Sequence, residues 1–425
     1  MGRHPQLEVA LLAIARRSTV AAFAATALAA GLVAAAPPGA ASPPGNSVRF
    51  STFNASLNRN AEGELVQHLS TTGNAQAANV AEVIQRVRPD VLLINEFDFD
   101  AQGTALRLFQ DNYLSVPHNG AAPIDYPYAF TAPSNTGIPS GFDLNNNGVA
   151  VTTPGAPGYG DDALGFGAFP GQFGMAVYSK YPIDTSAVRT FQDFLWRDMP
   201  GNLMPPGWYS AEEQAVLPLS SKSHWDLPIR IGKRTVHFLV SHPTPPVFDG
   251  VEDRNGRRNF DEIRLWADYV TPGAGSYIYD DQGRRGGLAP GASFVIAGDQ
   301  NSDPLDGDSI PGSIQQLTEN PRVNTSNTPQ SAGAVEATQL QGGANLTHRS
   351  DPRFDTADFA DSAPGNLRAD YVLPSSDLRI WDSAVFWPVR SDPLSRLTGE
   401  FPFPTSDHRL VWVDVKVPGA RSPVR

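Results

Sequence analysis

Residues 74–96 read NAQAANVAEVIQRVRPDVLLINE, and this stretch sets the fold class. Its first part predicts a helix over 74–88, because the apolar residues recur at helical spacing on one face. These residues are Ala77, Val80, Ile84 and Val87. Pro89 would end the helix. The apolar run 91–94 that follows is typical of a strand covered on both faces.

Outward from this stretch, the chain continues to alternate strands and helices. A strand at 48–54 precedes the helix, so strand, helix and strand follow in the order of a layered α/β fold. We predict a second helix at 259–270, with Asn259 as N-cap and Glu262 completing a capping box. We expect a long surface insertion at 115–172 and an irregular polar segment at 302–365. Further strands are expected at 175–178, 235–240, 294–297, 371–373 and 411–415.

Composition narrows the classes of function. The 425 residues are 18% charged and 40% hydrophobic, which is enough for a large buried core. The formal net charge is -12, and an acidic surface repels polyphosphate backbones, so no stable complex with nucleic acid is expected. The chain has no cysteine, which excludes disulfides and zinc sites built on thiolates.

The N-terminal region predicts export. Arg16 and Arg17 precede an alanine-rich apolar run at 20–36, the pattern of a signal peptide, and the arginine pair resembles a twin-arginine signal. A membrane anchor is the alternative. No later segment is apolar enough to span a bilayer, so a secreted mature protein is expected. The expected organisation is a signal peptide at 1–41, a linker at 42–46, one domain at 47–417 and a C-terminal tail at 418–425.

Polar residues gather at the ends of the predicted strands. One group follows its strands and comprises Asn54, Glu96, His242, Asp299 and Asn301. Another precedes its strands and comprises Asp370, Asp407 and His408. If the strands of the second group run antiparallel to those of the first, all these side chains meet at one sheet edge. Carboxylate and amide oxygens suit Mg²⁺, Mn²⁺ or Ca²⁺.

Six short segments in this order carry a family resemblance. They are FSTFN (50–54), LINE (93–96), VSHPTPP (240–246), GDQN (298–301), RADYV (368–372) and TSDHRLV (405–411). Together they resemble the signature segments of the endonuclease/exonuclease/phosphatase family, which includes the DNase I-like nucleases. The resemblance implies a DNase I-like four-layer sandwich, in which two mixed β-sheets pack face to face with helices outside.

The resemblance also implies roles for matching residues. Glu96 would be the main metal ligand, assisted by Asn54 and Asp407. A divalent cation, most simply Mg²⁺ or Mn²⁺, is the implied cofactor. The alternatives are a helix-capping or salt-bridged glutamate for Glu96 and a strand-ending side-chain turn for Asn54.

The catalytic groups follow from the same resemblance. Asp299 would orient or deprotonate the attacking water, and Asn301 would bind a phosphoryl oxygen. Asp370 would orient His408 and keep it charged. His242 would be a second imidazole that donates to the phosphate or assists the leaving group, and a structural histidine is its alternative. For Asp299 and Asn301 the alternative is an ordinary side-chain turn.

Basic residues near these segments are candidates for substrate binding. Lys222 and His224 combine a cation with an imidazole, and a cluster of three arginines follows the His242 segment. The alternative for the arginines is a solvated loop paired with nearby acidic residues. The arginines are Arg254, Arg257 and Arg258.

A separate motif resembles the start of a calcium loop. Asp143, Asn145, Asn147 and Gly148 follow the pattern D-x-N-x-N-G. Pro154 stands where an EF-hand places its bidentate glutamate, so a complete EF-hand is excluded. A non-helical calcium loop and a plain Asn-Gly turn both remain open.

The expected function is that of a secreted, metal-dependent phosphoesterase acting on small phosphodiesters or monoesters. An extracellular nuclease is the alternative within the enzyme class, and a non-catalytic binding protein on the same fold is the alternative outside it. An enzyme for lipid phosphoesters would need an exposed aromatic loop, for which Trp208 and Tyr209 are candidates unless they pack in the core. The sequence predicts no oligomeric state.

Overall fold

A computed structural model describes residues 46–420. The predicted signal peptide at 1–41, the predicted linker apart from Asn46, and residues 421–425 of the predicted tail lie outside the described residues. Within 46–420, no helix has the length and apolarity needed to cross a bilayer.

A six-stranded sheet is built around β1 (Ser47–Leu57), in the order β12-β13-β1-β2-β4-β3. β1 runs parallel to β2 (Val91–Phe97) and antiparallel to β13 (Val411–Lys416). The remaining strands of this sheet are β3 (Tyr128–Phe130), β4 (Met175–Ser179) and β12 (Arg379–Val385). The sheet is therefore mixed.

A second, five-stranded sheet has the order β11-β8-β7-β6-β5. β7 (Arg234–Ser241) and β8 (Ser293–Asp299) are parallel, whereas β11 (Asp370–Pro374) runs antiparallel to β8. The other strands are β5 (Arg189–Thr190) and β6 (His224–Ile231). A small two-stranded sheet joins β9 (Ala357–Asp358) to β10 (Asn366–Leu367).

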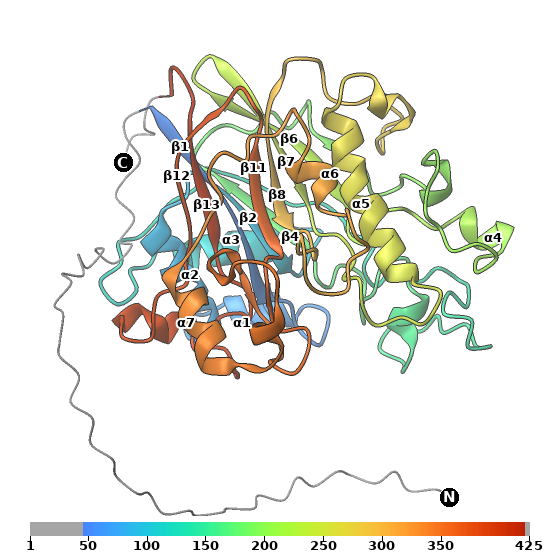
Figure 1. Cartoon of the computed structure of the whole chain (residues 1–425), viewed down its shortest axis with the longest axis horizontal. Coiled ribbons are helices and arrows are strands. Elements are labelled where there is room, and N and C mark those ends of the chain that lie inside the picture. The colour runs from blue at the N-terminus through green and yellow to red at the C-terminus, as the bar shows by residue number, and fades with distance from the viewer. Residues whose placement is uncertain (1–45, 421–425) are drawn as a thin grey trace, which may run out of the picture. The chain divides into compact units, whose positions relative to one another are not determined.

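The two large sheets pack face to face, with Phe50 and Leu93 on one side and Trp225, Val240 and Val295 on the other. Helix α2 (Ala75–Val87) covers the outer face of the six-stranded sheet, and α5 (Arg254–Val270) covers that of the five-stranded sheet (Figure 1). This arrangement confirms the predicted α/β four-layer sandwich.

Shorter helices complete the layers. The α-helices are α1 (Glu64–Leu69), α3 (Thr104–Phe109), α4 (Ala211–Gln214), α6 (Gln315–Thr318) and α7 (Ala332–Gln341). A π-helical turn spans Gln110–Leu114. Single turns of 3-10 helix lie at Tyr159–Asp162, Trp196–Asp198, Ala274–Tyr277, Gly343–Thr347, Pro352–Phe354 and Pro393–Leu397.

The helix predicted at 74–88 is confirmed in detail. The Asn74 side chain accepts a hydrogen bond from the Ala77 amide, a cap that contributes about 1 kcal/mol. Arg88 ends the helix in the left-handed conformation, with a φ of 55°. The predicted apolar face is buried against the sheet.

The helix predicted at 259–270 begins five residues earlier, at Arg254, so Asn259 is not its N-cap. Asn259 lies within α5, and its buried side chain donates hydrogen bonds to the carbonyls of Thr244 and Gln300. Glu262 does not form a capping box. Its carboxylate instead accepts hydrogen bonds from the amides of Ser221 and Thr244, at 2.7 and 2.6 Å. These contacts fasten two loops at the sheet edge to the helix.

The segment 115–172 is not simply a surface insertion. It contains β3, which forms the edge of the six-stranded sheet beside β4. Asn135 and Thr136 within it are buried, and the Asn135 amide group donates to the carbonyls of Gln192 and Ser220. The segment 302–365 likewise contains ordered elements, including the ten-residue helix α7.

Candidate active site

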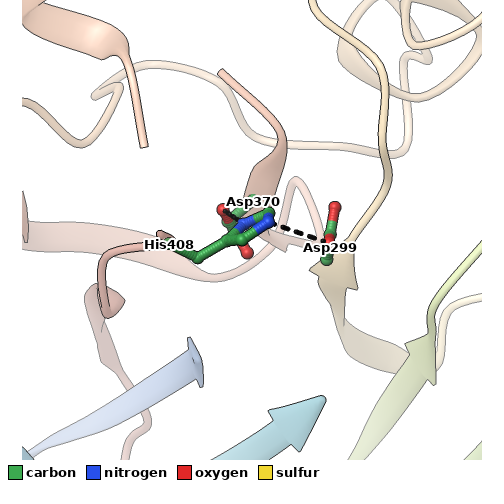
Figure 2. Close-up of side chains that lie close together, drawn as sticks. All are labelled: Asp299, Asp370 and His408. Atoms are coloured by element: carbon green, nitrogen blue, oxygen red, sulfur yellow. Dashed lines mark hydrogen bonds and ion pairs between the residues drawn. The ribbon is translucent and has the colours of Figure 1, made fainter. Parts of the chain in front are cut away.

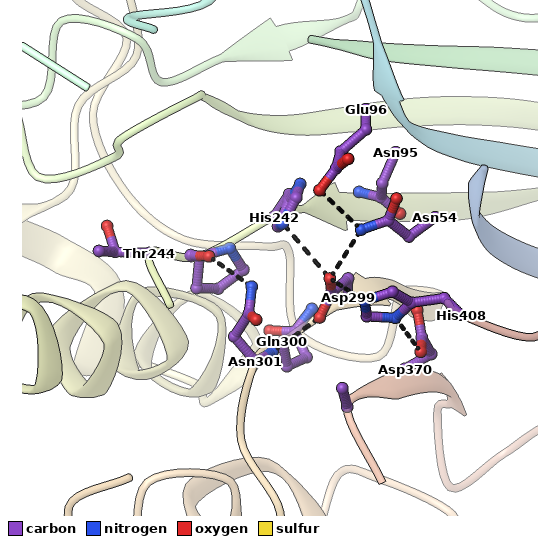
Figure 3. A network of polar contacts seen from close by, with 12 residues as sticks. Asn54, Asn95, Glu96, His242, Thr244, Asp299, Gln300, Asn301, Asp370 and His408 are labelled. Carbon is purple, nitrogen blue, oxygen red and sulfur yellow. Dashed lines mark hydrogen bonds and ion pairs between the residues drawn. The ribbon is translucent and has the colours of Figure 1, made fainter. Parts of the chain in front are cut away.

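The strand directions bring the predicted polar residues to one edge of the two sheets. β11 runs antiparallel to β8 with Asp370 directly opposite Asp299, and β13 runs antiparallel to β1. Groups that follow their strands therefore meet groups that precede theirs. Figure 3 shows the convergence, which comprises Asn54, Glu96, His242, Asp299, Asn301, Asp370 and His408.

Asp299 lies at the centre of this cluster and is buried. Its Oδ2 accepts a 3.0 Å hydrogen bond from Asn54 Nδ2 and lies 3.4 Å from His242 Nε2 and 3.6 Å from His408 Nε2. The pKa of Asp299 is raised to about 6, mainly because the carboxyl group is buried. The nearby charge of His408 acts to lower this pKa, and that of Asp370 acts to raise it. One carboxylate thus faces an amide and two imidazoles.

Gly298 allows Asp299 to lie close to the neighbouring strand. The glycine precedes Asp299 in β8 with a φ of 153°, and a Cβ there would lie 1.9 Å from the Ser241 carbonyl oxygen. Only glycine therefore permits β8 to approach β7 this closely. The close approach places Asp299 beside His242, which directly follows Ser241.

His408 is held by Asp370 on one side and faces Asp299 on the other (Figure 2). Its Nδ1 donates to Asp370 Oδ2 at 2.8 Å, and Thr356 Oγ1 donates to the same oxygen at 2.8 Å. Burial lowers the pKa of His408, but the charges of Asp370 and Asp299 and the hydrogen bond outweigh it, so the pKa is raised well above its ordinary value. The charged form of His408 is therefore favoured.

His242 has the opposite character. Burial, and then the positive charges of Lys222 and His408, lower its pKa well below the ordinary value. Its Nδ1 is buried without a hydrogen-bond partner within the described part of the chain. The site therefore contains one charged and one neutral imidazole, which can stabilise negative charge and donate a hydrogen bond, respectively.

Glu96, the residue before the last in β2, has a φ of 59°, a conformation that costs energy for a residue other than glycine. Its Oε1 accepts a 3.0 Å hydrogen bond from Asn54 Nδ2. Burial raises the pKa of Glu96, and the negative charges of Asp407 and Asp299 raise it further. The hydrogen bond from Asn54 and the charge of His408 act in the opposite direction but do not cancel the rise. A divalent cation would offset this crowding of negative charge, so the residues fit a metal site.

A second group of possible ligands overlaps this one. Asp299, Asp370 and His408 offer ligand atoms that all lie within 4.8 Å of one another. Without a cation, however, the two carboxylates raise the pKa of His408 and favour the charged imidazole, which has no lone pair for a metal. The electrostatics therefore favour the Glu96 side of the cluster for a cation.

Asn301 contacts the site mainly through its backbone. Its amide donates to Asp299 Oδ1 at 2.9 Å, with a φ of 50°, whereas its side-chain Nδ2 donates to the Pro243 carbonyl at 3.1 Å. The side chain thereby fixes the segment after His242. Asp407 is half-buried, and its charge acts on Glu96 and His408.

A cleft of about 500 Å³ opens beside the cluster. Glu96, Lys222 and His242 contribute to its walls, as do the aromatic residues Phe166, Phe173, Tyr209 and Phe248. Lys222 is buried, which lowers its pKa, while the charges of Glu262, Glu96 and Asp299 act to raise it. The cleft is therefore continuous with the candidate catalytic residues.

The predicted arginine cluster divides between different roles. Arg254 lines the cleft, pairs with Glu252 and lies 5.9 Å from the Trp208 ring centre. Arg258 also lines the cleft, but it donates to the carbonyls of Leu219, Leu164 and Pro218, so it serves as a structural brace.

Two of the predicted substrate-binding residues do not line the cleft. Arg257 donates to the backbone carbonyls of Glu252 and Leu203, and the ion pair of the kind expected in the alternative is formed by Arg254 with Glu252. His224 is buried between Ser220 Oγ, at 2.6 Å from Nδ1, and the Glu262 carbonyl, at 3.0 Å from Nε2. Burial lowers the pKa of His224 to about 3, so it is a neutral structural residue and the prediction was wrong.

The Asp143 loop has the geometry of a side-chain turn. The Asp143 carboxylate accepts hydrogen bonds from the amides of Asn147 and Gly148, at 3.1 and 2.7 Å. Asn145 Oδ1 accepts from Asn147, and Asn147 Oδ1 accepts from Val149. The plain-turn alternative thus accounts for the oxygens that were candidates for calcium binding.

Several residues of the site were not predicted. Thr356 orients Asp370, and Phe166, Phe173 and Phe248 line the cleft. Phe248 could have been noticed in the sequence, because it ends the apolar run PPVF (245–248) that follows the His242 segment. The other three sit in segments whose sequence gives no indication of their position.

A protein-family model covers the segments that contain the residues described above. The Endonuclease/Exonuclease/phosphatase family model matches residues 51–408. No curated protein sequence matches the chain.

Solved structures with low sequence identity are also similar. An endonuclease/exonuclease/phosphatase from Beutenbergia cavernae is 15% identical, with a TM-score of 0.46 over 88% of this chain and 72% of that one. A family protein from Leptotrichia buccalis is 14% identical, with a TM-score of 0.45 over 87% of this chain and 100% of that one. Sphingomyelinase C from Streptomyces griseocarneus is 13% identical, with a TM-score of 0.42 over 87% of this chain and 99% of that one.

The family match spans most of the chain and includes the residues that converge at the sheet edge. Members of this family are generally hydrolases that act on phosphate esters. The chain belongs to the endonuclease/exonuclease/phosphatase family.

Proposed function

We propose that this protein is a secreted, divalent-metal-dependent phosphoesterase that hydrolyses small phosphodiesters or monoesters by in-line attack of water. One observation carries the proposal. A single carboxylate oxygen, Asp299 Oδ2, faces Asn54, His242 and His408, with Glu96 joined to it through the same Asn54 amide. This is the set of groups that phosphoryl transfer needs for positioning and charge neutralisation.

Glu96, Asn54 and Asp407 are the residues proposed to hold the cation. When bound there, a divalent cation would neutralise charge on the phosphoryl oxygens and favour ionisation of a water. The observation that supports this choice is the excess of negative charge around Glu96, which raises its pKa.

The remaining groups have roles that follow from their surroundings. Asp299 is positioned to orient the attacking water and accept its proton. His408 supplies positive charge beside the phosphoryl oxygens, and His242, which is neutral, is positioned to donate a hydrogen bond through Nε2. Lys222 adds a second cation near Glu96 and Asp299. Loss of one such group typically costs about a hundredfold or more in rate.

A small substrate fits better than a polymer. The cleft holds about 500 Å³, whereas a nuclease needs an extended basic track for the backbone. Two arginines of the cleft are engaged within the protein, Arg254 by Glu252 and Arg258 by three carbonyls. The net charge of -12 also opposes binding of nucleic acid.

Export is part of the proposal and is supported by the sequence alone. The arginine pair at 16–17, the apolar run at 20–36 and the small residues at 40–41 have the pattern of a cleaved signal. Sequencing the N-terminus of the protein recovered from culture medium tests it. An uncleaved chain retained in the cell would contradict it.

Hydrolysis of bis-p-nitrophenyl phosphate and p-nitrophenyl phosphate, with Mg²⁺, Mn²⁺, Ca²⁺ or a chelator, tests the catalytic proposal. We expect metal-dependent turnover, with the ratio of diester to monoester identifying the preferred class. Glu96→Gln and His408→Asn should reduce the rate about a hundredfold or more. Arg257→Gln, outside the cleft, is the matched control. No turnover of either ester or of DNA would favour a non-catalytic binding protein.

A further inference from the structure

The walls of the cleft are largely apolar, although Asp161, Arg254, Asn255 and Arg258 also line it away from the catalytic cluster. The apolar walls include Phe166, Phe173, Tyr209, Leu217 and Phe248. Burying apolar substrate surface against such walls is favourable in proportion to the area removed from water. A substrate that placed only a polar group there would lose hydration without compensation.

The positively charged side chains of the cleft differ in whether they already have partners within the protein. Arg254 is paired with Glu252, and the guanidinium of Arg258 is used on three backbone carbonyls. Lys222 differs, because no group within residues 46–420 forms a hydrogen bond or ion pair with its ammonium. An anionic group of a ligand would therefore lie near Lys222, Glu96 and His242, and the rest of the ligand would contact apolar walls.

Phe248 indicates that these walls serve a ligand and not the core. It is 87% exposed, and its backbone has a φ of 66°, which is unusual for a bulky residue. Of the three exposed phenylalanines in 46–420, Phe166 and Phe248 line the cleft, and Phe401 does not. Phe173, also in the cleft, has a φ of 56°. Exposure of the Phe248 ring to water and the positive φ values of Phe248 and Phe173 both cost free energy, and both costs occur at the cleft.

We propose that the natural substrate is an amphiphilic phosphoester, in which a hydrophobic organic group lies in the cleft while the phosphate lies at the catalytic cluster. The inference rests on the proposed function for the position of the phosphate, and it adds the chemical class of the organic group. A membrane phospholipid and a soluble ester of a hydrophobic alcohol share this chemistry.

Binding of methyl-, butyl- and octylphosphonate, measured by isothermal titration calorimetry in the presence of Mg²⁺, tests the inference. These compounds lack a hydrolysable ester, so the result does not depend on turnover. We expect Kd to fall about two- to fourfold for each methylene that the cleft buries. Equal affinities for the three compounds would overturn the inference and leave the proposed esterase activity intact. Chain-length dependence without turnover of any ester would instead reject the proposed activity.

A pair of matched variants locates the effect. Phe248→Ala should reduce the ratio of the methyl- to octylphosphonate Kd by roughly tenfold. Phe401→Ala removes a ring that is 85% exposed but outside the cleft, and should leave the ratio unchanged. Thermal unfolding verifies that both variants are folded. An equal loss in both variants, or no loss in Phe248→Ala, would contradict the placement of the hydrophobic group.

Vesicles separate the two sources of the substrate. Sedimentation with phosphatidylcholine vesicles that is lost in Phe248→Ala and retained in Phe401→Ala would support a membrane lipid. Chain-length-dependent binding of the monomeric phosphonates without sedimentation would support a soluble ester.

Discussion

His408 and Asp370 are joined by a 2.8 Å hydrogen bond from Nδ1 to Oδ2, although 37 residues separate them in the sequence. Asp370 lies opposite Asp299 in the β8–β11 ladder, so the imidazole is enclosed between two carboxylates. Burial lowers the pKa of His408, and the charges of the two carboxylates outweigh this effect. The charge of His408 therefore depends on the strand register.

Replacing Asp370 with asparagine should test this dependence. The amide keeps the shape but removes one of the two charges that hold the pKa of His408 above its ordinary value. The pKa should then fall, and His408 should lose its proton at lower pH. We expect the alkaline limb of the pH–rate profile to move to lower pH and the rate at neutral pH to fall roughly a hundredfold. An unchanged profile would show that His408 does not act as a cation.

Glu96→Gln separates metal binding from folding. In a chelator the variant should be at least as stable as the wild type, because burial and nearby carboxylates raise the pKa of Glu96 and make its charge costly. Added Mg²⁺ or Mn²⁺ should raise the Tm of the wild type and not that of the variant. Differential scanning calorimetry measures both. An equal rise in Tm would place the cation elsewhere.

Lys222→Met should weaken function without weakening the fold. The buried ammonium lacks a partner among residues 46–420, so its removal should leave the Tm unchanged or higher. The KM for a phosphodiester should rise about tenfold or more, because a charge-assisted contact is lost. Lys233→Met removes an exposed lysine and is the control. A normal KM in Lys222→Met would exclude contact with the substrate.

We predict a pH dependence of the protein's stability that arises from Asp355, a residue outside the catalytic cluster. Burial, and then the charges of Asp303, Asp306 and Asp351, raise its pKa from the ordinary 3.8 to about 9. Its contribution to the free energy of unfolding is therefore fully present below about pH 4 and is lost as the pH rises through about 9.

The variant Asp355→Asn should have a higher Tm than the wild type at pH 8 to 9 and a similar Tm near pH 4, as measured by thermal unfolding across this range. Replacing the exposed Asp382 with asparagine should leave the pH dependence as it is. A parallel pH dependence in the wild type and Asp355→Asn would contradict the assignment.

The parts of the fold that were predictable have strong local signals. The stripe on 74–88, stopped by Pro89, produced α2, and the apolar run after it produced β2. The order of the six polar segments placed the carboxylates and imidazoles at one edge, because strand direction decides which ends meet. These features depend on periodicity and chain direction, which a single sequence contains.

Other features depend on contacts that are distant in the sequence. Asn259 and Glu262 have the spacing of a capping box, but both side chains are used on loops from elsewhere in the chain, so the pattern misplaced the start of α5. Strand β6 was missed because Pro228 and polar residues interrupt its pattern. His224 resembled a ligand until its two nitrogens were found to be engaged by Ser220 and Glu262.

The division of the site between the two large sheets has a consequence for how activity arises. Asn54 and Glu96 belong to the six-stranded sheet, and Asp299 and Asp370 belong to the five-stranded sheet. Neither sheet alone carries the full set of groups, so the proposed hydrolysis requires that the two sheets have docked. A nascent or nicked chain in which either half is unfolded would be inert towards phosphate esters, and enzymatic activity would report completion of folding.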